Sequence, residues 1–488
     1  MRREWSLTTL LAATLAGCLS VGPDYEPAEV REPAAALPDQ ALPEFRSTNT
    51  TVIVAETNCV SITESELAQW WRSFGDETLV DLIQTAFASN HTLRAAAQNV
   101  RRARALLAAA RGKWEPQLDL GGGFARSGTS ANGASGASLT RNLYTGGFDA
   151  AWEIDIFGGT RRAVEAAWSE YEAECADLDG VWISLAAETG RAYFELRTVQ
   201  ERLAVARDNL KLQQETHDIL SSRLKAGIGD DLAVQQARYN VEATRSTIPP
   251  QIVAQEELLN TLAVLTGMEP GALHARLLGG KMGELIAPRR LVGIDAGLLR
   301  RRPDIRAAER NLAAQSARIG EATADLYPRF FLSGSIGLEA LEARDFFKFP
   351  GSRHWSFGPS VSWKIFSGNS VRANIDIQDA LYEAAAEQYE QTLLTAQKEI
   401  RDALMAYVQE FHRYESLLAA VDAATSAVNI SKNLYRNGLR DFNNVLDAER
   451  SQLELQESCA VSRGQIATRL VALYKALGGG WSPWLDKE

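Results

Sequence analysis

Residues 152–159 have the sequence W-E-I-D-I-F-G-G, and the chain then continues to residue 226 without a proline. Along this continuation, apolar or small residues recur at alternating steps of three and four, which is the spacing of a heptad seam. At a rise of 1.5 Å per residue, a helix of this length would extend about 100 Å. The residues just before it alternate apolar and polar, as in a β-strand. The sequence therefore predicts a strand that leads into one very long helix.

The segment from residue 117 to 157 has the alternation of two amphipathic strands. Apolar residues occupy one face of each strand, namely Leu118, Leu120, Phe124, Phe148, Trp152, Ile154 and Ile156. The other face of the second strand is acidic, and a Gly/Ser-rich loop at 127–138 separates the strands. This pattern suits strands with lipid on one side and water on the other. A half-buried hairpin of a water-soluble protein would have the same pattern.

The second half of the chain repeats the first at an offset of about 211 to 212 residues. The sequence L-R-A-A-A-Q-N at 93–99 aligns with I-R-A-A-E-R-N at 305–311, Trp152 aligns with Trp363, and Gly227 aligns with Gly438. Each half therefore predicts a helix, a strand pair, a long helix, a tight turn and a returning helix. The seam continues near the first turn through Gln213 and His217, polar residues that predict a looser helix contact there.

The repeat defines the expected boundaries. The first unit is expected at 66–297, with strands at about 117–157, a long helix at 158–226 and a return helix at 231–266 that is interrupted at Pro249 and Pro250. The second is expected at 298–480, with strands at 329–366, a long helix at 371–436 and a return helix at 441–477, followed by a tail at 481–488. Pro359 predicts a bulge in the last strand. Residues 267–297 are Gly-rich and are expected to be irregular.

The N-terminus predicts export. Arg2 and Arg3 precede the apolar run 7–17, which ends in L-A-G-C at 15–18, and this run is too short to span a bilayer. We expect a signal peptide at 1–17 and a proline-rich extended tether at 18–65. The signal resembles that of bacterial lipoproteins, which implies a covalent lipid on Cys18, and Leu19 favours sorting to the outer membrane. An ordinary signal peptide with an incidental cysteine is the alternative.

Composition excludes several classes of function. The chain has 488 residues with a formal net charge of −11 and no basic cluster, so nucleic acid is not an expected partner. Cys59, Cys175 and Cys459 have neither disulfide nor metal spacing, and we interpret Cys175 and Cys459 as small apolar helix residues. The histidines also lack ligand spacing. No nucleophile, base and orienting residue can be nominated, so we predict no enzyme activity and no cofactor. No segment after the signal has eighteen consecutive apolar residues, so we predict no transmembrane helix in the mature chain.

The number of strands predicts the assembly. Four amphipathic strands cannot close a barrel, and two chains would give eight strands, whose interior side chains fill. Three chains would give twelve. A cyclic homotrimer is therefore the smallest assembly expected to hold open water.

Six short motifs, in order, resemble one family. They are V-G-P-D-Y-E-P at 21–27, W-W-R-S-F-G-D-E-T-L at 70–79, L-R-R-R-P-D-I-R-A-A-E-R at 299–310, W-K-I-F at 363–366, V-L-D-A-E-R-S at 445–451 and L-G-G-G-W at 477–481. Together with the repeat, they resemble the outer membrane efflux proteins of the TolC type, in the lipoprotein branch that serves resistance-nodulation-division (RND) pumps. The resemblance covers nearly the whole mature chain.

The resemblance implies a fold and a function. The fold is an α+β membrane protein: a trimeric twelve-stranded β-barrel in the outer membrane, with four strands per chain, continued by a periplasmic α-helical coiled-coil barrel. The function is the passive exit duct of a tripartite efflux system for small molecules such as drugs or metal ions. The implied partners are a periplasmic membrane-fusion adaptor, outer membrane lipid, and an inner membrane RND transporter in preference to an ABC transporter.

The resemblance also implies site residues at the two turns. Asn444 and Asp447 match positions that form constricting rings in the family, with Arg440, Tyr435 and Arg450 as tethering partners. The turns imply adaptor contacts at Gly227, Asp230, Asp231, Gly438 and Leu439. The first turn departs from the family, with L-A-V at 232–234 in place of L-D-V.

Physical reasoning supports the gate but leaves alternatives open. Three copies of Asp447 around a narrow axis would repel one another and attract cations. Asp447 and Arg450 could instead pair along a solvated helix, and both turns could be plain helix caps, with Gly227 in the left-handed position and Asp230 or Asp231 as the N-cap. Two other functions also remain: a type I secretion duct of the same fold, and a lipid-anchored coiled-coil scaffold without a pore, which would leave the strands unexplained.

Overall fold

The computed structural model describes residues 21–27, 52–54, 67–132, 138–280, 283, 285–287 and 296–480. The chain forms two compact units: unit 1 comprises 1–29, 99–175 and 306–391, and unit 2 comprises 30–98, 176–305 and 392–488. The predicted signal peptide, Cys18, Cys59 and the tail at 481–488 lie outside the described residues.

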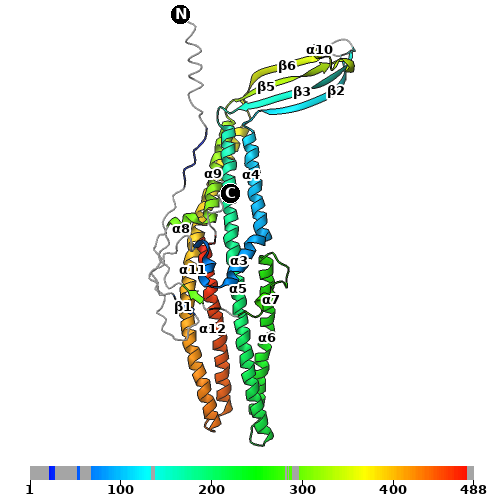
Figure 1. Cartoon of the computed structure of the whole chain (residues 1–488). Helices are drawn as coiled ribbons and strands as arrows, with labels where there is room; N and C mark the ends of the chain where they lie inside the picture. The colour runs from blue at the N-terminus through cyan, green and yellow to red at the C-terminus, as the bar shows by residue number, and fades with distance from the viewer. Residues whose placement is uncertain are drawn as a thin grey trace. The chain divides into compact units, whose positions relative to one another are not determined.

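Unit 1 contains one four-stranded antiparallel sheet. Its strands are β2 (Gln117–Gly128), β3 (Thr140–Ile154), β5 (Arg329–Ala340) and β6 (Arg353–Ser362), in the order β2-β3-β5-β6 (Figure 1). The register places Phe148 opposite Ile336 and Trp152 opposite Leu332. The strand pair of the first half (β2 and β3) is therefore joined to the strand pair of the second half (β5 and β6) through the pairing of β3 with β5.

The register divides the sheet into an apolar and a polar face. Since side chains alternate along a strand, paired residues share a face, and one face collects Leu118, Leu120, Phe124, Phe148, Trp152, Ile154, Phe330, Leu332, Ile336, Trp355, Phe357 and Val361. The other face carries Asp119 opposite Asp149, and Ser335 opposite Ser356 with their hydroxyl oxygens 2.8 Å apart. Many of the apolar residues are exposed in the single chain, including Leu120 at 74%. The predicted amphipathic strands are confirmed.

The bulge predicted at Pro359 is wrong. Pro359 pairs directly with Leu332, and the one-to-one register continues on both sides of it. In the single chain β6 is an edge strand, and there a residue without an N–H is tolerated because its nitrogen can face away from the neighbouring strand.

The helices of the two halves have equal lengths. Helices α4 (His91–Gly112) and α9 (Pro303–Ala324) have 22 residues each. The long helices α5 (Gly159–Lys225) and α11 (Ser370–Arg436) have 67 each, and the return helices α6 (Asp231–Leu265) and α12 (Phe442–Ala476) have 35 each. The indole nitrogens of Trp152 and Trp363 donate to the carbonyls of Trp114 and Leu326 at 2.8 and 3.0 Å. The sequence repeat is therefore a structural repeat down to these hydrogen bonds.

Unit 2 buries the predicted seams. Along α5 the buried seam residues include Leu185, Thr189, Ala192, Leu196, Leu203 and Ala206, and along α11 they include Leu393, Ala396, Ile400, Tyr407, Phe411, Tyr414 and Val428. The rings of Tyr407 and Phe411 meet edge to face at 5.1 Å within the buried seam of α11. Cys175, at the end of a unit 1 segment, and Cys459, in unit 2, are both partly buried.

The interruption predicted in the first return helix is also wrong. Pro249 and Pro250 lie inside α6, which remains one helix. Both prolines are exposed, so the carbonyls of Arg245 and Ser246, which lose their backbone donors, lie on a face that water can reach.

Short elements occupy regions where the sequence predicted none. Strand β1 (Val52–Val54), within the predicted tether, pairs in parallel with β4 (Leu285–Ala287), within the segment expected to be irregular. That segment also contains α7 (His274–Leu277) and the start of α8 (Ala296–Arg301). Two elements, η1 (Trp70–Phe74) and α3 (Glu77–Ser89), lie at the start of the first unit, where each half was expected to begin with a helix, and η2 (Ala343–Asp345) and α10 (Phe349–Ser352) lie between β5 and β6.

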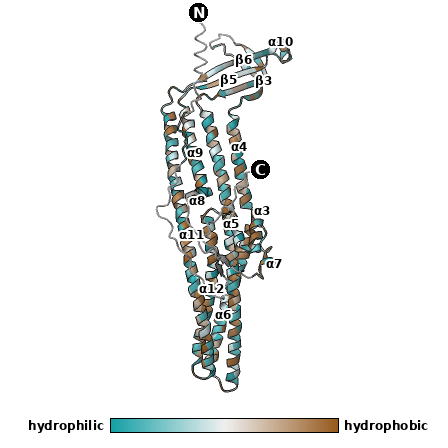
Figure 2. Cartoon of the chain, turned by 60° about the vertical axis from the view of Figure 1, so that its left-hand side comes forward, coloured by the Kyte–Doolittle hydropathy of each residue, from teal (hydrophilic) through white to brown (hydrophobic). Residues whose placement is uncertain are grey.

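Within the described part of the chain, none of the helices combines the length and the apolar character required to cross a bilayer. Figure 2 shows why: apolar and polar residues are interleaved along each long helix. Such helices bury a seam against other helices and leave the rest of their surface polar.

Candidate functional site

The two turns that join the long helices to the return helices have the same backbone geometry. Gly227 and Gly438 have φ angles of 75° and 72°, in the left-handed region. At the first turn the amides of Gly227 and Ile228 donate to the carbonyls of Leu224 and Arg223. At the second, the amides of Gly438 and Leu439 donate to Tyr435 and Leu434. Both turns are therefore Schellman motifs, as their glycines predicted.

The two turns differ in the helices that follow them. Asp230 is the N-cap of α6, and its carboxylate accepts from the amide of Leu232 at 3.1 Å. Asp441 occupies the same position before α12, but its side chain makes no capping bond. At the first turn the carboxylate of Asp230 thus caps the helix that follows, as expected for Asp230 or Asp231. At the second turn the carboxylate of Asp441 makes no such bond.

One apolar cluster packs the two turns of unit 2 together. It contains Leu220, Ala233, Val234, Ala237, Phe442, Val445 and Leu446, with Leu224 and Tyr435 packed against it. Outside this cluster the turns expose Ile228, Leu232 and Leu439, at 60 to 70%. The ends of the four helices therefore form one body with an apolar interior and an apolar exposed tip.

The predicted gate residues lie on this body. Arg440, Asn444, Asp447 and Arg450 are exposed, and Tyr435 is half-buried. The Tyr435 ring packs on Phe442 at 5.2 Å and beneath the Arg223 guanidinium at 5.7 Å. Arg450 lies over the ring of Tyr239 at 5.9 Å. Within the described protomer, two of the three predicted tethers, Tyr435 and Arg450, thus make aromatic and cation–π contacts, and no ion pair joins Asp447 to Arg450.

Helices α11 and α12 are tied just beyond these residues. Lys432 donates to Glu449 at 2.9 Å, and the Glu449 side chain is 7% exposed. The amide of Gln452 donates to the hydroxyl of Thr425 at 3.1 Å. On α5, Gln213 is buried with its Oε1 unpartnered, and His217 Nδ1 lies 3.3 Å from Asp218. An unpartnered buried amide oxygen destabilises the packing around it, which agrees in direction with the looser contact predicted there.

Sequence reasoning missed a second set of polar ties, in which two of the quoted motifs take part. Arg302 donates to Asp304 and Glu399 at 2.7 Å and to the carbonyl of Ala476 at 2.6 Å. Burial alone would lower the pKa of Arg302, but the two carboxylates raise it above its usual value. The motif at 299–310 therefore joins the start of α9 to α11 and α12 within unit 2.

The motif at 70–79 makes a similar tie. Asp76 caps α3 by accepting from the amide of Thr78 at 2.9 Å, and its other oxygen accepts from the hydroxyl of Tyr193. Burial, and then this hydrogen bond, raise the pKa of Tyr193 to about 12. Trp70 stacks on Tyr474 with ring centroids 5.5 Å apart. Both motifs are thus structural, and only the three-dimensional contacts reveal the partners.

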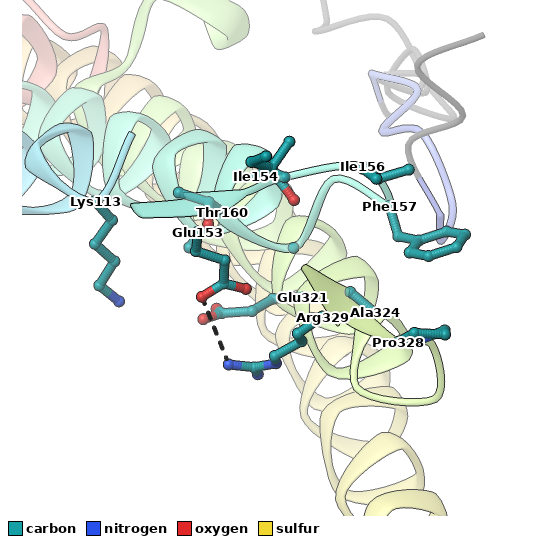
Figure 3. A pocket seen from close by; sticks show the side chains of 13 residues that line it. Lys113, Glu153, Ile154, Ile156, Phe157, Thr160, Glu321, Ala324, Pro328 and Arg329 are labelled. Carbon is teal, nitrogen blue, oxygen red and sulfur yellow. Dashed lines mark ion pairs between the residues drawn. The ribbon is translucent and has the colours of Figure 1, made fainter. Parts of the chain in front are cut away.

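A cavity at one end of the sheet does not form a ligand site. It has a volume of about 100 Å³ and is lined by residues including Lys113, Glu153, Glu321 and Arg329 (Figure 3). Figure 3 shows the Glu153 carboxylate beside Arg329, at a distance of 4.0 Å. Pockets for drug-sized ligands measure about 300 to 1,000 Å³, so this one is too small. Among the residues that the structure describes, no group of three potential metal ligands gathers either.

Both halves of the repeat match one family model, described as outer membrane efflux protein, over residues 82–268 and 297–479. The toluene efflux pump outer membrane protein TtgF of Pseudomonas putida is 31% identical over 479 residues, which cover 97% of this chain and 96% of TtgF. The probable outer membrane lipoprotein SilC of Salmonella typhimurium is 28% identical over 468 residues, 96% of each protein. The solved outer-membrane channel OprN has a TM-score of 0.83 and 34% identity, covering 95% of this chain and 100% of that one.

Proposed function

The chain belongs to the outer membrane efflux protein family, and we propose that it is the passive exit duct of a tripartite efflux system. The main support for this function is that one chain contains both a sheet with one apolar and one polar face and two 67-residue helices that bury a seam. A sheet of that kind suits an interface between lipid and water, and helices of that length are about 100 Å long. Efflux energy would come from the inner membrane transporter, so the chain itself catalyses no reaction.

The free strand edges support a homotrimer. Within one chain β2 and β6 are the edge strands, and their unpaired N–H and C=O groups are costly in lipid. Three copies, joined β6 to β2, would satisfy these groups in a closed twelve-stranded sheet. The exposed apolar residues of the long helices would be covered by neighbouring copies in the same arrangement.

The turns support a gate and a partner contact. Exposed Asp447 and Asn444, repeated three times around the axis, would form a polar constriction that attracts cations, with Arg440, Tyr435 and Arg450 beside it. The exposed tip formed by Gly227, Asp230, Asp231, Gly438 and Leu439 would receive a periplasmic adaptor that links the duct to an RND transporter. Small molecules such as drugs, solvents or metal ions are the proposed cargo.

The lipid anchor is part of the same proposal. SilC is named an outer membrane lipoprotein, and Cys18 of this chain follows a signal that resembles those of lipoproteins. A lipid on Cys18 would hold the N-terminus at the membrane. The two alternatives, a protein secretion duct and a scaffold without a pore, differ from this proposal in the cargo and in conductance respectively.

Conductance in planar lipid bilayers tests the duct and its gate. Wild-type protein should give small, infrequent openings, and Asp447→Ala should increase the conductance several-fold because three charges leave the constriction. Asp422→Ala, which removes an exposed aspartate of α11 away from the turn, should behave as the wild type. Inserted protein that carries no current in either variant would refute the duct. An increase for Asp422→Ala as large as that for Asp447→Ala would refute the assignment of the gate.

A further inference from the structure

A buried arginine holds the first described segment of the chain. Arg162, in the first turn of α5, has a side chain that is 3% exposed. Its guanidinium donates to Asp24 Oδ1 at 2.6 Å, to the carbonyls of Val21 and Gly22 at 3.3 and 3.4 Å, and to Glu165 Oε2 at 2.8 Å. We name residues 21–24 the strap. Three of the four acceptors thus belong to the strap, and all of these residues lie in unit 1.

The strap is also bonded to the end of the sheet. The amide of Val21 donates to the carbonyl of Phe157 at 3.2 Å, and Phe157 follows the last residue of β3 by three positions. The Phe157 ring stacks on Tyr327 with centroids 4.7 Å apart. Figure 3 shows the Phe157 side chain directed away from the small charged cavity.

Close backbone packing fits the strap to α9. Gly22 has a φ of 93°, and a Cβ added to it would collide with the Cα of Gly320. A Cβ on Gly320 would lie 2.8 Å from Cγ of Arg162. The strap therefore depends on a glycine at both positions, because only glycine allows the two backbones and the arginine side chain to approach this closely.

The electrostatics favour a specific contact over an incidental one. Burial would lower the pKa of Arg162, but its hydrogen bonds and charge interactions with Asp24 and Glu165 raise that pKa. A guanidinium withdrawn from water is stabilised only if its donors are paired. Without the strap, Arg162 would keep Glu165 as its acidic acceptor, whereas the strap supplies a second carboxylate and two carbonyls.

We propose that Arg162 and Gly320 form a receptor for the strap, and that this receptor fixes the point at which the lipid chain of Cys18 leaves the protein. The proposal rests on the lipidation of Cys18 proposed above. Cys18 precedes Val21 by three residues, which span at most about 11 Å. The lipid is thereby confined to about that distance from the Val21 contact with Phe157. Lipid and sheet then enter the membrane at a set spacing, which does not depend on the predicted tether at 25–65 that follows the strap.

Hydrogen exchange with mass spectrometry on the purified full-length protein tests the receptor. Gly22→Ala changes only the strap, and we expect amide exchange in residues 21–26 to become at least tenfold faster. The matched control is Gly112→Ala, where a Cβ meets nothing within 4 Å and φ is not positive. Arg162→Ala should act like Gly22→Ala, and its control is the neighbouring Arg161→Ala. Exchange in Gly22→Ala and Arg162→Ala that equals the wild type would overturn the receptor.

The position of the lipid is tested with a photoactivatable fatty acid supplied to growing cells. In the wild type, cross-links should concentrate on the segments around Phe157 and Tyr327, and in Gly22→Ala they should spread to other segments. Incorporation with an unchanged pattern in Gly22→Ala would overturn the role of the strap and leave lipidation intact. If the wild type carries no more fatty-acid label than Cys18→Ser, the proposed lipidation of Cys18 is refuted. The lipid part of this proposal is then refuted as well, whatever hydrogen exchange shows.

Discussion

Alanine at Gly438 should loosen the second turn without any steric clash. The glycine has a φ of 72°, and a Cβ placed there meets nothing within 4 Å. The energetic effect therefore comes from the backbone alone. The turn is closed by two hydrogen bonds of 2.9 Å, from the amides of Gly438 and Leu439 to Tyr435 and Leu434, and both depend on this left-handed conformation.

The size of the effect follows from the conformational preferences of alanine. A residue with a Cβ pays about 1 to 2 kcal/mol in the left-handed region. Alanine also lowers the conformational entropy of the opened turn, which stabilises the closed turn by about 0.4 to 1 kcal/mol and offsets part of this cost. The net cost is about 1 kcal/mol, which corresponds to a roughly fivefold increase in opening of the turn because 1.4 kcal/mol is tenfold.

Hydrogen exchange at the amides of Gly438 and Leu439 measures this opening directly. Gly438→Ala should exchange about fivefold faster there, and Gly227→Ala should do the same at the first turn, since its φ of 75° and open surroundings are equivalent. Gly279→Ala, which has open space but no positive φ, is the control and should change nothing at either turn. If Gly438→Ala and Gly279→Ala are indistinguishable at the second turn, the left-handed cap does not set its stability.

Three further predictions concern the ties in unit 2. The pKa of Tyr193 is about 12 in the folded chain against a usual 10.0, so its contribution to stability is fully present below pH 10 and is lost as pH rises through 12. The thermal unfolding temperature should therefore fall more steeply with pH for the wild type than for Tyr193→Phe. Parallel plots of unfolding temperature against pH would contradict this. Arg302→Ala should lower the free energy of unfolding by about 2 to 3 kcal/mol, mainly through loss of the bond to the Ala476 carbonyl, because Asp304 and Glu399 are half-exposed and can be rehydrated. Chemical denaturation measures this change. In the control Arg300→Ala, which alters an exposed side chain, the free energy of unfolding should stay within about 0.5 kcal/mol of the wild-type value. Burial raises the pKa of the Cys459 thiol to about 11, so iodoacetamide at pH 8 should alkylate it about a hundredfold more slowly than in the unfolded chain; equal rates would refute the burial.

The sequence predicted the elements whose signals are local and periodic. The heptad seams and the glycines at 227 and 438 located both long helices and their turns, because a helix of 67 residues contains many periods and the left-handed cap has a strong residue preference. The sequence restricted the N-cap of the first return helix to Asp230 or Asp231, and in the structure it is Asp230. The strand faces followed from alternation alone.

The errors arose where burial or long-range pairing decides the outcome. Pro249 and Pro250 break a helix on propensity, yet their exposed position lets α6 continue. Pro359 disrupts a central strand, yet β6 lies at an edge of the sheet in this chain. Three-residue strands such as β1 and β4 carry no periodicity, and their pairing joins segments more than 200 residues apart in the sequence.

The repeat separates what the backbone decides from what the side chains decide. Both halves have return helices of 35 residues and the same Schellman turn, so a difference between the halves must come from side chains. In the first half the carboxylate at the N-cap is bonded to the helix that follows, whereas Asp441 makes no such bond. The position of Asp447 is occupied in the first half by Gln236, which carries no charge. Because only the second half presents a carboxylate there, a charged constriction built from three chains would contain three carboxylates and not six, and its repulsion would act on α12 alone.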